Sequence, residues 1–267
     1  MASESSPAPE IELRDVTVHF GTRPILDRVS ASIEAGSSVA VIGPNGVGKT
    51  TLLKVLAGVL SAQEGNVLIR GVERRSTPEA ELQIRQWTTF IPDDLWTPKV
   101  VSGREYLMAV GALYGLPYRR VLEHTERLIQ LFQLNEVADK PLTDCSTGQK
   151  KKFSLCAGLV TDAPLLLFDE PFSGGLDPAG IMAFREILRS FAETRSHTVV
   201  FTTPVPELVE VTADRILVIS DSHIVLDESV AELKKQHAGQ PFGEVLQNLV
   251  FPNAASQVRS YLSPDNS

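Results

Sequence analysis

Apolar and polar residues alternate near the start of the chain, as they do in a half-buried β-strand. The segment IELRDVTVHF at 11–20 shows this alternation, and similar patterns at 25–33 and 38–42 predict two more strands. Gly21 and Thr22 lie between the first two patterns and predict a turn. The run VAVIG at 39–43 is apolar throughout, which is typical of a central strand covered on both faces.

Strand and helix patterns alternate along much of the remaining chain. Later strand patterns occupy 65–70, 88–91, 165–168, 198–202, 215–219 and 224–226. Helical spacing is found at 49–60 and at 178–191. This alternation predicts an α/β protein whose mainly parallel sheet is covered by helices on both faces.

The middle of the chain has a different character and predicts an inserted helical subdomain at about 93–160. Helical spacing occupies 102–115, 118–133 and 147–160. We expect a disordered tail at 1–9, one domain at 10–235 that contains this insertion, and a C-terminal extension at 236–267. Short helices at 243–250 and 254–262, separated by Pro252, are expected in the extension.

Composition narrows the class of protein. The chain has 267 residues, of which 43% are hydrophobic and 22% are charged, so it can build a core and is not wholly disordered. A net charge of −8 argues against a protein that coats nucleic acid. The two cysteines, Cys145 and Cys156, are too few for a disulfide framework and are expected to be buried or half-buried free thiols.

The hydropathy pattern predicts a soluble protein. The longest uncharged stretches, Ala35–Gly48 and Tyr106–Tyr118, have 14 and 13 residues, whereas a bilayer requires about 20 apolar residues. The first ten residues, MASESSPAPE, do not resemble a signal peptide. We therefore expect a cytoplasmic location, with any action at a membrane depending on a partner.

A glycine-rich motif follows the strand predicted at 38–42. The sequence GPNGVGKT at 43–50 matches G-x-x-x-x-G-K-[ST] between a strand and a helix, the context of a phosphate-binding loop. Gly43, Gly46 and Gly48 let the backbone approach a polyphosphate closely. Lys49 is placed to reach the β- and γ-phosphates, and the Thr50 hydroxyl to bind Mg²⁺.

Two carboxylates follow the buried strand at 165–168, in the sequence LLLFDEP. Ligands of open α/β sheets bind at this end of the strands, so Asp169 is a candidate Mg²⁺ ligand. Glu170 is the candidate that orients and deprotonates an attacking water. By itself a carboxylate here would more often be a helix N-cap, and the phosphate-binding motif favours the catalytic interpretation.

These motifs resemble those of the ATPase subunits of ATP-binding-cassette (ABC) transporters over about 10–235. CSTGQKKK at 145–152 resembles the family signature, GLDP at 175–178 the D-loop, and ADRILVIS at 213–220 a further family strand. The resemblance implies a P-loop NTPase (RecA-like) core with an N-terminal antiparallel β subdomain and an inserted helical subdomain. It also implies the nucleotide contacts Phe20 (on adenine), Gly43, Pro44, Asn45, Gly46, Val47, Gly48, Lys49, Thr50 and Thr51.

The resemblance further implies that two subunits pack head to tail around ATP. Signature residues would then act on the partner's nucleotide, namely Ser146, Thr147, Gly148 and Gln149. They precede a predicted helix, whose N-terminus favours an anion. Asp177 of the D-loop would lie at the dimer interface. Lys150 and Lys151, in contrast, are expected on a solvated helix face.

Three positions depart from the family pattern. Asp93 replaces a glutamine that contacts Mg²⁺ and water, although a carboxylate can still bind the metal, so Asp93 is a tentative Mg²⁺ ligand. Pro204 stands where the family has a switch histidine, ten residues before Asp214, and it removes a donor to the γ-phosphate. The segment DEPFSGGLDP has one residue more than usual between Pro171 and Leu176.

The sequence therefore predicts an ATPase subunit that powers a membrane exporter. Its expected ligands are ATP and Mg²⁺, and its hydrolysis of ATP is expected to be slow. The segment VSGREYLMAVGALYG at 101–115 resembles the ABC-2-type subclass, which serves separately encoded permeases, and Trp96 is a candidate anchor for that partner. The expected assembly is a homodimer or a heterodimer, peripheral on the cytoplasmic face of the membrane, with no nucleic acid. Alternatives are a regulatory ATP-binding module and an ABC protein with a task other than transport.

Overall fold

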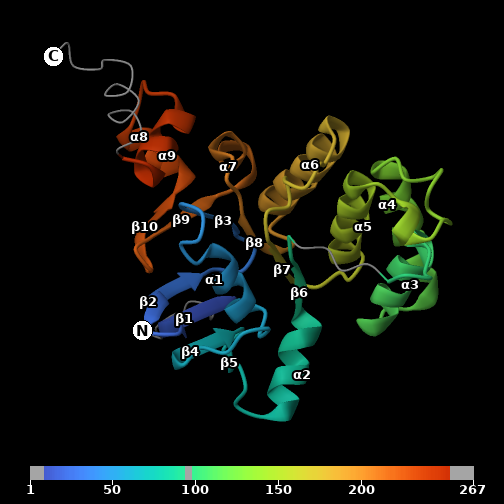
Figure 1. The fold of residues 1–267 in the computed structure, drawn as a ribbon, viewed down its shortest axis with the longest axis horizontal. Helices are drawn as coiled ribbons and strands as arrows, with labels where there is room; N and C mark the ends of the chain where they lie inside the picture. The colour runs from blue at the N-terminus through green and yellow to red at the C-terminus, as the bar shows by residue number, and fades with distance from the viewer. Residues whose placement is uncertain (1–8, 94–97, 253–267) are drawn as a thin grey trace, which may run out of the picture.

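A computed structural model describes residues 9–93 and 98–252. Three sequence-based expectations concern residues outside these ranges: most of the predicted tail at 1–9, Trp96 as an interface anchor, and the helix at 254–262. Within the described ranges the chain forms two sheets and the helices that cover them (Figure 1).

The smaller sheet is antiparallel and lies near the N-terminus. Its strand order is β2 (Arg23–Ile33), β1 (Ile11–Phe20), β4 (Glu64–Ile69) and β5 (Val72–Glu73). The larger sheet has the order β10 (His223–Ser229), β9 (Arg215–Ser220), β3 (Ser38–Ile42), β8 (Thr198–Thr202), β7 (Leu165–Phe168) and β6 (Thr88–Ile91). Neighbours in it are parallel except for the edge strand β10, which confirms the predicted mainly parallel core.

The helices fall into three groups in space (Figure 1). Beside the strands lie α1 (Lys49–Leu56), α2 (Pro78–Trp87), α6 (Pro178–Thr194) and α7 (Pro206–Thr212). At one side of the molecule are α3 (Gly103–Leu113), α4 (Tyr118–Leu131), a 3-10 turn (Leu142–Asp144) and α5 (Thr147–Leu159), the predicted helical insert. At the opposite side are α8 (Val230–Gln236) and α9 (Phe242–Val250).

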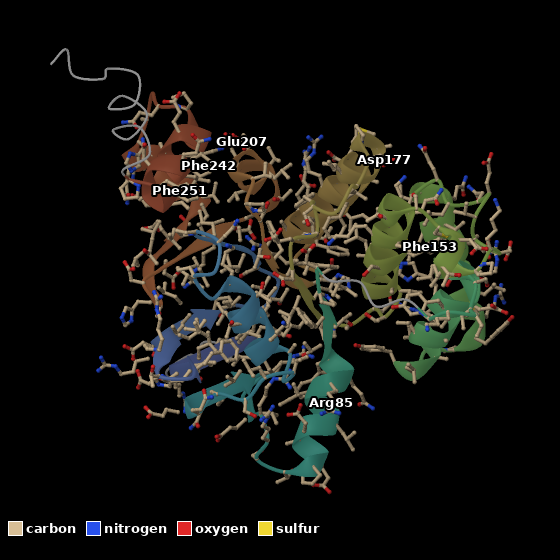
Figure 2. The ribbon with its side chains drawn as sticks, viewed as in Figure 1. Arg85, Phe153, Asp177, Glu207, Phe242 and Phe251 are labelled. Carbon is tan, nitrogen blue, oxygen red and sulfur yellow. The ribbon has the colours of Figure 1, made fainter. Side chains whose placement is uncertain are left out.

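Two helices of the insert begin with reciprocal side-chain caps. Ser102 accepts a hydrogen bond from the backbone N–H of Glu105, whose carboxylate accepts from Ser102 N–H, so the two residues form a capping box at the start of α3. Ser146 and Gln149 form the same arrangement at the start of α5. The helices then pack closely, because a Cβ atom added to Gly103 would lie 2.2 Å from the Phe153 ring. Figure 2 shows Phe153 among the helices of this insert.

Alternate residues of the large sheet face two separate hydrophobic clusters. Ala40, Phe168 and Phe201 belong to the cluster that includes residues of α3–α9. Val41 and Leu167 belong to the cluster formed with α1 and the small sheet. Because side chains of a strand alternate between faces, the same strands supply both clusters, and this explains their continuously apolar sequences. Cys145 and Cys156 are buried free thiols, as predicted.

Aromatic packing supports the end of β7. Phe184 of α6 is fully buried, and its ring centroid lies 5.0 Å from that of Phe168 and 5.5 Å from that of Phe172, both edge-on. Phe168 precedes Asp169 directly, and Phe172 follows Glu170 by two residues. The cluster therefore fixes the backbone on both sides of the two predicted site carboxylates.

We expect Phe184→Ala to lower the free energy of unfolding by about 3–5 kcal/mol, because it removes a fully buried ring and leaves a cavity. Met182, on the same helix, is 58% exposed. Its replacement by alanine is the matched control and should change the unfolding free energy by less than about 0.5 kcal/mol. Urea denaturation of the three chains measures both effects, and equal midpoints for all three would contradict the packing role of Phe184.

Candidate functional site

The predicted phosphate-binding loop connects β3 to α1, where the glycines have conformations that favour glycine. Gly43 has φ 154° and Gly48, which precedes α1, has φ 116°. A Cβ atom would lie 2.3 Å from the carbonyl oxygen of Ile219 if added to Gly43, and 2.8 Å from that of Ile25 if added to Gly48. The backbone thus lies against β9 and β2 at a distance that a side chain would prevent.

Lys49 extends back along this loop. Its side-chain amine donates to the carbonyl oxygens of Gly43, at 2.9 Å, and Pro44, at 3.0 Å, although the residue is only 6% exposed. Burial lowers the pKa of Lys49, while the nearby carboxylates of Glu170 and Asp169 act in the opposite direction. The amine is therefore held by two neutral carbonyls, partners that a phosphate group can replace.

A cavity of about 380 Å³ brings together most residues predicted to contact the nucleotide. Its lining is Phe20, Ile25, Asn45, Gly46, Gly48, Lys49, Thr50, Thr51 and Glu170. Phe20 ends β1 and is 58% exposed, so its ring is available to a planar ligand. Pro44 and Val47 line an adjoining cavity with Ser220, Asp221 and Ser222, three residues that the sequence analysis did not single out.

The acidic motif ends β7, beside the end of β8. The buried carboxylate of Asp169 accepts a 2.7 Å hydrogen bond from the hydroxyl of Thr202, which in turn accepts one of 2.8 Å from the Glu170 N–H. Glu170 has φ 45°, a left-handed conformation that non-glycine residues seldom adopt. Thr202 therefore joins the site through its place at the end of a parallel strand, and no motif in the sequence identifies it.

The environment of Glu170 favours the protonated acid. Burial raises the pKa of Glu170, and the carboxylates of Asp93 and Asp169 raise it further, while Lys49 and Lys151 lower it. A carboxylate that takes up a proton more readily is a better general base near neutral pH. The position of Glu170 at the cavity wall and this pKa direction both suit the predicted role in activating water.

Asp93 follows β6 and forms contacts that the sequence analysis did not predict. Its Oδ1 lies 3.1 Å from the side-chain amine of Lys151 and 2.8 Å from the hydroxyl oxygen of Ser173. Lys151 is fully buried, so the prediction of a solvated helix face is wrong for this lysine. The error arises because a lysine is usually solvated, and the carboxylate that permits its burial lies 58 residues away in the sequence.

The signature residues line a second cavity, of about 580 Å³. Its lining is Gln133, Ser146, Thr147, Gly148, Gln149, Lys152, Gly175 and Asp177. Asp177 caps α6 by accepting from the N–H of Gly180 and pairs with Lys152 at 2.8 Å. Figure 2 labels Asp177 beside α6. One chain therefore does not bring the signature into the cavity lined by Lys49 and Glu170.

The position of the family's switch histidine lies between β8 and α7. Pro204 is exposed there and contributes no side-chain donor. His197 precedes β8 and stacks on Phe191, with ring centroids 4.2 Å apart, while His223 opens β10 and contacts the backbone of Asp27. Both histidines thus have contacts of their own, and neither lies at the position of Pro204.

Comparisons with known proteins agree with this fold and site. Residues 26–173 match the family model described as ABC transporter. The chain is 29% identical to Nod factor export ATP-binding protein I of Rhizobium meliloti, over 93% of this chain and 75% of that protein. It is 32% identical to the energy-coupling factor transporter ATP-binding protein EcfA of Methanoculleus marisnigri, over 84% of this chain and 80% of that one.

Solved structures show the same fold. An ATP-binding subunit of an ABC transporter superposes with a TM-score of 0.79 at 23% identity, covering 90% of this chain and 98% of that chain. A dimeric ATP-binding cassette in a post-hydrolysis state bound to ADP and phosphate gives a TM-score of 0.74 at 21% identity, covering 82% and 98%. The chain belongs to the ABC transporter family and is an ATP-binding cassette subunit. Within the described residues, no helix is long and apolar enough to cross a membrane.

We expect Thr202→Val to lower the free energy of unfolding by about 1–3 kcal/mol, because it leaves the buried carboxylate of Asp169 and the Glu170 N–H without their partner. Thr202→Ser keeps the hydroxyl and is the matched control, which should stay closer to the wild-type value. Urea denaturation measures the difference. A valine variant as stable as the serine variant would show that the hydroxyl does not support the carboxylates.

Proposed function

We propose that this chain binds and hydrolyses ATP as the nucleotide-binding subunit of an ABC exporter, and that its hydrolysis is slow. The observation that carries the proposal is the single cavity shared by the phosphate-binding loop, Lys49 and Glu170. Lys49, a cation suited to phosphates, and Glu170, the candidate base for water, both line this cavity. Such positioning and charge stabilisation account for most of the catalysis of phosphoryl transfer.

The residues around this cavity suit an ATP–Mg²⁺ complex. Backbone N–H groups of the loop and the N-terminus of α1 would hold the phosphates, with Lys49 replacing its carbonyl contacts by phosphate oxygens. Thr50 and Asp169 would hold Mg²⁺, which usually takes one or two protein ligands besides phosphates and water. The metal would neutralise charge that develops on the phosphates. Glu170 would accept the proton of the attacking water.

Two departures support slow turnover. Pro204 has no side-chain donor for the γ-phosphate. Asp93 replaces the family's glutamine, and its Oδ1 already contacts Lys151 and Ser173, which makes it a weaker candidate for Mg²⁺. Loss of one donor to a developing charge typically costs about 10²–10³ in rate, judged from oxyanion-hole donors.

The exporter assignment and its assembly rest on the relatives and on the separation of the two cavities. Curated relatives include proteins named for Nod factor export and for daunorubicin resistance. Because the signature Ser146–Gln149 lines its own cavity, a second cassette could contribute its signature to the nucleotide, in a homodimer or heterodimer. Bound ATP would then stabilise the dimer by mass action.

A separately encoded permease is the proposed membrane partner, and it would hold the subunit at the cytoplasmic face. Residues 98–102 lead into α3, and Val100 among them is 89% exposed. The resemblance of residues 101–115 to the ABC-2-type subclass supports docking in this region. The negative net charge gives no reason to propose a nucleic-acid partner.

The alternative to an exporter ATPase is an ATP-binding regulatory module with little catalysis. The two departures from the family pattern, Asp93 and Pro204, favour this alternative.

We expect the purified chain to release phosphate slowly from ATP in the presence of Mg²⁺, and both Lys49→Ala and Glu170→Gln to abolish that release. The first variant removes the cation that meets the phosphates, whereas the second removes the base and should still bind ATP. Lys54→Ala, on the same helix, is the control. Phosphate release that survives Glu170→Gln would contradict the assignment of the base, and tight ATP binding without any release would favour the regulatory alternative.

We expect Pro204→His to increase turnover by about tenfold or more, because it restores a donor near the γ-phosphate. Pro204→Ala is the matched control, since it removes the ring without supplying a donor, and should leave turnover near the wild-type value. Steady-state phosphate release at saturating ATP measures the effect. Equal turnover in the histidine and alanine variants would show that the missing donor does not limit the rate.

A further inference from the structure

Two departures from the family pattern meet at one buried lysine. The carboxylate that replaces the family glutamine, Asp93, lies 3.1 Å from the side-chain amine of Lys151. The loop with the additional residue contains Gly174, and a Cβ atom there would lie 3.6 Å from Cδ of the same lysine. Lys151 thus contacts both changed segments, one through its charge and the other through its aliphatic stem.

The two charges differ greatly in their exposure to water. The side chain of Lys151 is 1% exposed and that of Asp93 is 46% exposed. Burying an ammonium group without a partner is unfavourable, so the burial of Lys151 depends on the carboxylate. A half-exposed carboxylate, in contrast, can be hydrated by water when the lysine is absent. Replacing Lys151 should therefore change the free energy of unfolding only a little.

The same contacts connect two functional segments of one chain. Lys151 lies on α5, two residues after the signature Ser146–Gln149 that opens this helix. Ser173 follows Glu170 in the loop after β7, and its hydroxyl oxygen lies 2.8 Å from both Asp93 Oδ1 and the carbonyl oxygen of Glu170. The backbones of α5 and of the loop after Glu170 also lie close together, because a Cβ atom at Gly148 would lie 2.4 Å from the carbonyl oxygen of Gly175.

We propose that Lys151 is a positioning residue for ATP hydrolysis. With Asp93 and Ser173 it forms a latch that fixes the signature helix α5 relative to the loop that carries Glu170 in the same chain. Because α5 is a continuous helix of 13 residues, a constraint at Lys151 also sets the orientation of Ser146–Gln149. The inference rests on the proposed function, since the latch acts on hydrolysis in a closed pair of cassettes.

The test compares variants that break the latch with variants that preserve it. Lys151→Met removes the charge and keeps the stem, Lys151→Arg keeps the charge, and Asp93→Asn removes the partner. Lys234→Met is the control for loss of a lysine charge away from the site, because Lys234 of α8, whose side chain is 43% exposed, pairs with Glu210 of α7 at 2.9 Å. Turnover, KM for ATP and the urea midpoint of unfolding are measured for each chain.

We expect Lys151→Met to lower turnover by about tenfold, because a small misplacement of catalytic groups is costly, with KM for ATP changed by less than about twofold. Its unfolding midpoint should stay near that of the wild type, and Lys151→Arg should keep at least about half of the turnover. The double variant of Asp93→Asn and Lys151→Met should lose no more turnover than the more impaired single variant, because coupled residues are not additive.

Three results would overturn the latch. The first is unchanged turnover in Lys151→Met. The second is a loss of turnover matched by a lower unfolding midpoint and not relieved by Lys151→Arg, which would assign the lysine a structural role only. The third is losses that multiply in the double variant, which would show that Asp93 and Lys151 act independently.

If the wild-type chain releases no phosphate, the proposed function is wrong, and turnover cannot test the latch. The latch is then tested in the nucleotide-free chain by measuring hydrogen exchange at the backbone amides of α5. Lys151→Met should speed that exchange by about tenfold, because a lost constraint favours local opening, while Lys234→Met should leave it unchanged. Unchanged exchange in Lys151→Met would overturn the latch.

Discussion

The parallel alignment of the central strands is the constraint on which the site depends. Residue Phe168 of β7 is paired with Ile91 of β6 and with Phe201 of β8, so the three strands end at the same level. Three parts of the site must then lie side by side: Asp169 after β7, Thr202 at the last position of β8, and the segment that leads from β6 to Asp93. The phosphate-binding loop joins this edge because β3 pairs in parallel with β8. The register of the strands therefore makes segments that are distant in the sequence adjacent in space.

Sequence patterns predicted those strands and helices whose own residues show a clear apolar pattern. The bounds of β3, β6, β7 and β8 agree with the prediction, since each is a short apolar run. The patterns did not reveal α2, in which only Ile84 is buried, or α7, which has seven residues, because neither buries a clear apolar face. A short helix on the surface is decided by its caps and its neighbours more than by periodicity.

The candidate site was predictable where its residues lie in one continuous segment of the sequence. The loop at 43–50 and the pair Asp169–Glu170 are of this kind, because backbone approach requires glycine and metal or proton chemistry requires carboxylates. Thr202 and Lys151 were not predictable, since a threonine and a lysine have many ordinary roles. They join the candidate site through partners 33 and 58 residues away in the sequence, which only the folded chain brings within hydrogen-bond distance.

The two hydrophobic clusters on opposite faces of the large sheet affect how the sequence of such a chain can evolve. Val41 and Leu167 face one cluster, while their sequence neighbours Ile42 and Phe168 face the other. A substitution in the helical layers can therefore be repaired by another in the same cluster, without disturbing the packing under the phosphate-binding loop. Variation on one face is largely independent of variation on the other, so the packing under the phosphate-binding loop can persist while the helices of the other cluster diversify.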